Sequence, residues 1–131
     1  MIVTVELHRW LSIWETYGDE DAFPREELDG IMRRVKDIVS QSGVEMRYVN
    51  GLPFIDTLLY TNHRTKEIDD VIEAYTSISK TAAGSYGVIY LRDDEDDKHY
   101  NEFQVYVFRK GECIRRADKD FSPCIPMIED G

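Results

Sequence analysis

Two stretches of the sequence repeat their apolar residues at the spacing of an amphipathic helix. The first begins at Pro24, which suits the first turn of a helix, and stops at Ser42 and Gly43. Its apolar stripe is Leu28, Ile31, Met32, Val35, Ile38 and Val39. The second follows a capping residue, Thr65, and its stripe is Ile68, Val71, Ile72, Tyr75 and Ile78. A helix with one apolar face must bury that face against another layer, so the rest of the chain must supply that layer.

The remaining apolar segments alternate as β-strands do. The first strand is predicted over residues 2–14, with one face formed by Val3, Val5, Leu7, Leu11 and Ile13. Asn50 and Gly51 provide turn chemistry between strands at 44–48 and 54–61, which predicts a hairpin. Three more strands are predicted at residues 85–91, 103–109 and 113–116.

The elements follow the order β-α-β-β-α-β-β-β, which predicts one α+β domain over residues 1–131. We expect a two-layer sandwich, a mostly antiparallel sheet with both helices on one face, and a ferredoxin-like topology is possible for the first six elements. A chain of this length can bury a sufficient core without a metal or disulfide. Because the strands alternate, the other sheet face should meet solvent.

The second face of the first strand carries Glu6, His8, Trp10, Ser12 and Trp14. Two tryptophans beside a histidine either lie under a covering layer or form part of a recognition surface. Large aromatic side chains are usually mostly buried, so the sequence favours cover.

An acidic run ends the strand at 85–91 and comprises Asp93, Asp94, Glu95, Asp96 and Asp97, directly after Arg92. Adjacent carboxylates repel one another, and no packing requirement in the sequence explains their clustering. The 26 Asp and Glu against 16 Lys and Arg give a net charge of −10, which argues against nucleic-acid binding and favours a basic protein partner. The alternative is that the acidity serves solubility alone.

No residue pattern indicates a catalytic or metal site. The histidines are single, Cys113 and Cys124 lack a zinc or redox spacing, and Ser85 is not in a nucleophile elbow. The acidic run has Lys98 and Gln104 where a calcium loop has Gly and Glu. We therefore expect no cofactor, no metal and no enzymatic activity.

The sequence also predicts a cytoplasmic protein. Residues 1–7 lack the features of a signal peptide, and no apolar run is long enough to span a membrane. A reducing compartment would keep Cys113 and Cys124 as thiols. The oligomeric state stays open.

Several motifs in order along the chain resemble bacterial immunity protein family 7. They are HRWLSI (8–13), NGLPF (50–54), NHR (62–64), EID (67–69), GSYGVIYLRDDED (84–96), NEFQVYVFRKG (101–111) and SPCIPMIED (122–130). The segments at 84–96 and 122–126 are the most specific. Arg9 departs from the family pattern, which has Gly after the histidine.

The resemblance implies a cytoplasmic antidote that binds the C-terminal domain of a polymorphic or contact-dependent toxin. Such toxins are often nucleases with basic active sites, which an acidic protein approaches rapidly. The predicted toxin-binding residues are Asp93, Asp94, Glu95, Asp96, Asp97 and Tyr100, with Asp19, Glu20 and Asp21 as a second acidic site. The alternatives are an enzyme with a small-molecule pocket at His8, Trp10 and Trp14, or a general protein-interaction module.

Overall fold

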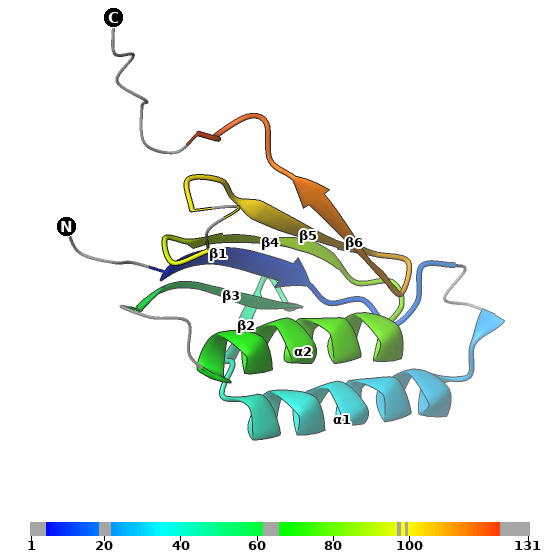
Figure 1. Ribbon diagram of the computed structural model, residues 1–131. Helices are drawn as coiled ribbons and strands as arrows, with labels where there is room; N and C mark the ends of the chain where they lie inside the picture. Colours follow the sequence, from blue (N-terminus) through cyan, green and yellow to red (C-terminus); the bar gives the residue numbers. More distant parts are fainter. Residues whose placement is uncertain (1–4, 19–21, 62–65, 97, 99, 124–131) are drawn as a thin grey trace, which may run out of the picture.

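The computed structural model describes residues 5–18, 22–61, 66–96, 98 and 100–123, with only the backbone of residues 57–61. Its elements are β1 (Val5–Ser12), α1 (Arg25–Ser42), β2 (Met46–Val49), β3 (Leu52–Thr61), α2 (Lys66–Thr81), β4 (Tyr86–Asp93), β5 (Gln104–Arg109) and β6 (Glu112–Ala117) (Figure 1). The predicted order of strands and helices is confirmed. The predicted helix cap Thr65 lies outside the described residues.

All six strands form one sheet in the order β2-β3-β1-β4-β5-β6, and every neighbouring pair is antiparallel. β1 and β2 run in the same direction with β3 between them, and α1 connects them. In the same way, β3 and β4 flank β1 and are joined by α2. The first six elements are thus two interleaved split βαβ units, the ferredoxin-like topology considered above.

Both helices lie on the same side of the sheet (Figure 1). The buried residues between the layers come from the alternating positions of the strands and from the two helical stripes. They include Val5, Leu7, Leu11, Ile31, Val35, Ile55, Ile68, Val71, Tyr75, Ile78, Ile89, Leu91 and Phe108. The predicted α+β sandwich with two helices on one sheet face is therefore confirmed.

Two-residue turns close both hairpins. Asn50 and Gly51 connect β2 to β3 with φ angles of 52° and 77°, and Lys110 and Gly111 connect β5 to β6 with 48° and 75°. Positive φ at both central residues matches the type I′ turn, whose twist suits paired strands. At the end of α1, Gly43 takes the left-handed conformation of a helix C-cap.

Glycines in the segment 84–87 allow β4 to lie directly against β1 and the chain that follows it. A Cβ atom at Gly87 would stand 2.1 Å from the carbonyl oxygen of Trp10, and one at Gly84 would stand 2.0 Å from that of Thr16. Between them, the buried Ser85 hydroxyl accepts the backbone N–H of Trp14 at 3.1 Å. Because that N–H is directed to a side chain, β1 ends at Ser12 rather than at the predicted residue 14.

In the part of the chain that the structure describes, neither helix is long and apolar enough to cross a membrane.

Candidate functional site

The sheet face opposite the helices, here called the open face, has no described helix or strand above it (Figure 1). Trp10 on β1 remains 44% exposed and Tyr86 on β4 remains 50% exposed. Their ring centroids lie 6.0 Å apart at an interplanar angle of 85°. The expectation that this sheet face meets solvent therefore holds at Trp10 and Tyr86, whereas the prediction that a layer covers the tryptophans is wrong at Trp10.

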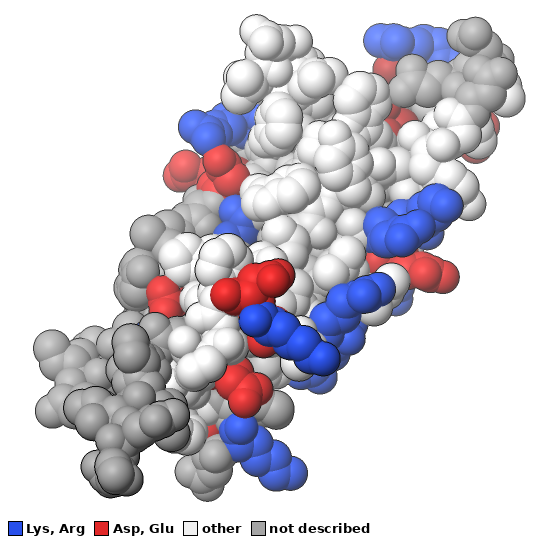
Figure 2. Space-filling model, turned by 90° about the horizontal axis from the view of Figure 1, so that it is seen from above, with Lys and Arg blue, Asp and Glu red and all other residues white. Residues whose placement is uncertain are grey.

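The open face is broad and mostly uncharged. Figure 2 shows it from above, with an uncharged band through its upper middle and with Lys, Arg, Asp and Glu side chains along its borders and across its lower part. The pairing of Trp10 with Val88, and of His8 with Tyr90, continues across β5 and β6 on the same face. Its central apolar positions are Val88, Tyr90, Val105, Val107 and Ile114. Val105 is buried and the other four are partly buried, so the exposed aromatic rings at Trp10 and Tyr86 are the part of this face that is typical of a protein-binding site.

One end of the open face contains a hollow of about 560 Å³, here called the aromatic hollow, lined by Glu6, His8, Tyr90, Phe103 and Phe121. The Tyr90 ring centroid lies 5.6 Å from that of Phe103 and 5.9 Å from that of Phe121, at interplanar angles of 87° and 71°. The imidazole of His8 lies 5.7 Å from the Phe103 ring. The rings therefore wall the hollow from several directions.

A chain of hydrogen bonds and ion pairs leads from this hollow to the acidic run. Nε2 of His8 lies 2.9 Å from one oxygen of Glu6, and the other oxygen accepts Nε–H of Arg92 at 2.7 Å. Arg92 also pairs with Asp94. The side chains of Glu6 and Arg92 are about nine-tenths buried. Buried charges require such partners, so this network fixes the start of the acidic run against β1.

The acidic run forms a compact turn, here called the acidic turn (residues 93–96). Asp93 is buried, and its carboxylate accepts the backbone N–H of Glu95 at 3.0 Å. Asp96 accepts the backbone N–H of Lys98 and the amide of Gln104. The statement that no packing requirement explains the cluster is therefore wrong for Asp93, Asp94 and Asp96, which satisfy local donors. The sequence did not reveal this because the donors are backbone N–H groups and the side chains of Arg92 and Gln104, and only the folded chain brings them to these carboxylates.

The other predicted binding residues are placed only in part. Tyr100 is half exposed, in the segment between β4 and β5. Asp97 and the second acidic site, Asp19, Glu20 and Asp21, lie outside the described residues. Their role in binding stays a prediction.

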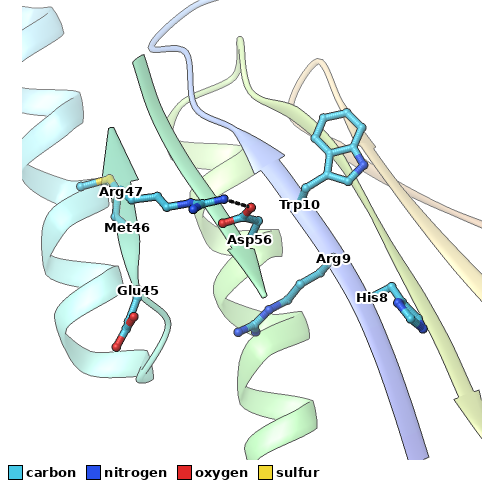
Figure 3. Close-up of a pocket in the computed structure, with 7 residues that line it drawn as sticks. All are labelled: His8, Arg9, Trp10, Glu45, Met46, Arg47 and Asp56. Atoms are coloured by element: carbon cyan, nitrogen blue, oxygen red, sulfur yellow. Dashed lines mark hydrogen bonds and ion pairs between the residues drawn. The ribbon is translucent and has the colours of Figure 1, made fainter. Parts of the chain in front are cut away.

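A cavity of about 610 Å³ lies where β2 meets β3 and is lined by His8, Arg9, Trp10, Glu45, Met46, Arg47 and Asp56. Figure 3 shows Arg9 and Trp10 leaving β1 in different directions, and Arg47 reaching across to an ion pair with Asp56. Trp14 is not among the lining residues, and its indole N–H donates to the Ser12 hydroxyl at 3.1 Å. Of the three residues of the suggested enzyme pocket, His8 and Trp10 thus line one cavity and Trp14 does not.

Arg9 departs from the family pattern, and the sequence did not predict that it is buried. It occupies the helix-facing register of β1, between Leu7 and Leu11, and is 9% exposed. Its Nε and Nη1 atoms are enclosed and have no hydrogen-bond partner among the described residues, and its guanidinium lies 5.8 Å from the centroid of the Tyr75 ring. Burial lowers the pKa of Arg9, against the opposing effect of Tyr75, Glu67 and Asp56. Arg9 alternates with Leu7 and Leu11, and this place on the apolar face of the strand was the sequence signal that could have revealed its burial.

The remaining reactive side chains are dispersed. Cys113 is exposed on β6, and the partial burial of its thiol raises its pKa. Cys124, His63 and His99 lie outside the described residues. The Ser85 hydroxyl forms hydrogen bonds with the backbone of Trp14. Within the described ranges, no group of three or more His, Cys, Asp or Glu residues is arranged to hold a metal ion.

Comparison with known proteins gives one result. The family model described as Immunity protein 7 matches residues 4–130, which include every described helix and strand. No curated protein and no solved structure gave a significant match.

Proposed function

Because the chain belongs to the Immunity protein 7 family, we propose that it neutralises one cognate bacterial toxin by binding it through the open face. The family match supports an immunity role against a toxin in general. The observation that favours this face is its exposed aromatic surface, centred on Trp10 and Tyr86. Tryptophan and tyrosine dominate the energetics of protein interfaces because they bury large areas with little loss of conformational freedom.

The acidic turn follows the opposite end of β4 from Tyr86, at the border of the open face, and supplies charge rather than apolar contact. Glu95 is exposed and Asp94 and Asp96 are partly exposed, in a chain of net charge −10. Such a field attracts a basic partner and raises the rate of encounter more than the lifetime of the complex. This favours a nuclease toxin, whose nucleic-acid site is basic, with Tyr100 and residues 19–21 as further contacts.

The proposed partner is the C-terminal domain of a polymorphic or contact-dependent toxin, bound in the cytoplasm of the producing cell. The chain acts by occupying a toxin surface and not by catalysis. An apolar face with a polar border is the usual anatomy of such an interface.

Co-expression tests the proposal. The toxin domain encoded next to this gene should be tolerated by cells that also make the wild-type chain, and the two proteins should copurify. Cells making Trp10→Arg should lose protection, because a charge replaces an exposed ring at the centre of the open face. Tyr17→Arg, at an exposed ring beyond the end of β1, is the matched control and should protect normally. Loss of protection by both variants, or by neither, contradicts the proposed surface.

A further inference from the structure

The aromatic hollow combines apolar walls with a carboxylate. Phe103 and Phe121 stand nearly perpendicular to Tyr90, and Glu6 lies among them. The Phe121 side chain is 64% exposed, so its ring is accessible to a partner that approaches the open face. Aromatic ring faces carry partial negative charge and attract cations.

The charges around the hollow have the same sign as the ring faces. Glu6, Arg92 and Asp94 form one ion-pair network, with two carboxylates and one guanidinium. His8 also contacts Glu6, at 2.9 Å; with the imidazole counted as neutral, the group carries one net negative charge, and the exposed Glu95 follows it in the acidic turn. The hollow therefore lies in a region of negative potential.

The chemistry of the lining discriminates between side chains that could enter. A neutral apolar side chain would remove the Glu6 carboxylate further from water without adding positive charge, which is unfavourable. An acidic side chain would be repelled. An arginine or lysine side chain would lay its methylene stem on the rings and bring its charge to the ring faces and the carboxylate.

We propose that the aromatic hollow is a cage for one cationic side chain, arginine or lysine, of the toxin. The proposal rests on the proposed function and adds to it the chemical group that the toxin inserts. The occupant is inferred from charge complementarity: an acidic chain, a net-negative group at the hollow, and aromatic walls.

Blocked amino acids test the cage without the toxin. Nuclear magnetic resonance should show concentration-dependent shifts of the Tyr90, Phe103 and Phe121 ring signals with Nα-acetylarginine methylamide or the corresponding lysine derivative. The isosteric neutral citrulline derivative and the apolar norleucine derivative are the controls. A response to arginine but not lysine, or the reverse, identifies the occupant. Equal shifts with charged and neutral probes, or none with any, would overturn the proposal.

A variant pair tests the same cage in the complex. Phe121→Leu keeps an apolar side chain but removes the ring, and should weaken toxin binding about 3-fold or more. Phe23→Leu, at an exposed ring outside the hollow, should leave it unchanged. If the wild type does not bind the toxin, the proposed function fails. If the wild type binds and the two variants behave alike, only the cage fails.

Discussion

Gly87 shows how closely two strand backbones approach at the centre of the sheet. A Cβ atom there would meet the Trp10 carbonyl oxygen at 2.1 Å and the Leu11 Cα atom at 2.7 Å. Neither backbone atom can move without breaking the β1–β4 pairing. We expect Gly87→Ala to lower the free energy of unfolding by more than about 2 kcal/mol, measured by urea denaturation.

Gly30 provides the control for that substitution. It lies within α1, where an added Cβ atom would touch only arginine side chains, at 3.6 and 3.7 Å. Gly30→Ala should raise the free energy of unfolding by about 0.5–1 kcal/mol, because alanine restricts the unfolded chain and favours the helix. Equal losses for the two variants would contradict the close approach at Gly87.

Two equally buried arginines should respond in opposite ways to removal. Arg9 and Arg92 are each 9% exposed. Arg92 pairs with Glu6 and Asp94, so Arg92→Met removes the guanidinium that neutralises these two carboxylates and should destabilise the fold by about 3 kcal/mol. Arg9 has two enclosed nitrogen atoms without hydrogen-bond partners among the described residues, so Arg9→Met should be neutral or stabilising by up to about 1 kcal/mol.

Urea denaturation of both methionine variants at neutral pH decides between these accounts. A loss of stability in Arg9→Met as large as that in Arg92→Met would show that the Tyr75 ring and the nearby carboxylates fully compensate the buried Arg9 charge.

At the scale of elements, both helices and the strand order followed from the sequence because each apolar stripe has one period and one buried face. The turn between β2 and β3 also carried its own signal, in Asn50-Gly51. The conformation of the acidic turn had no such signal in the sequence. Its carboxylates accept hydrogen bonds from Arg92, Gln104 and nearby backbone N–H groups, and the sequence does not show which groups the fold brings to them.

The acidic turn should govern the rate of association. We expect the combined variant Asp94→Asn, Glu95→Gln and Asp96→Asn to bind the toxin about 10-fold more slowly at low salt, with a flatter dependence on salt. Asp93 is kept, because it is buried and accepts the Glu95 backbone N–H. Stopped-flow association at low and high salt measures the effect.

The control removes the same charge from exposed positions of α1: Glu26→Gln, Glu27→Gln and Asp37→Asn. It should slow association less than the turn variant. Equal slowing by both would mean that net charge, and not the acidic turn, controls encounter.

At the scale of the whole molecule, the sequence specified the covered face of the sheet better than the open one. Apolar residues at alternate positions must be buried somewhere, which places the two helices over Leu7 and Leu11. Nothing in the spacing of His8 and Trp10 shows whether a further layer lies above them. Strand alternation predicted one solvated sheet face while the two tryptophans favoured cover, and the arrangement of the six strands and two helices leaves this face without a described helix or strand above it (Figures 1 and 2).

The central claim is that the open face, and not the molecular surface in general, binds the toxin. Trp10 and Tyr48 are both exposed aromatic residues. Tyr48 follows Met46 by two residues on β2, so the two side chains share one face of the sheet, and Met46 packs against the core on the helix side. The side chains of Trp10 and Tyr48 therefore lie on opposite sides of the sheet.

The most direct test is the dissociation rate of the toxin complex for Trp10→Ala and Tyr48→Ala, measured by surface plasmon resonance. The Trp10 variant should dissociate about 10-fold faster or more, as expected for a central interface aromatic, and the Tyr48 variant should match the wild type. Equal dissociation rates for the two variants, or a larger effect at Tyr48, would contradict binding through the open face.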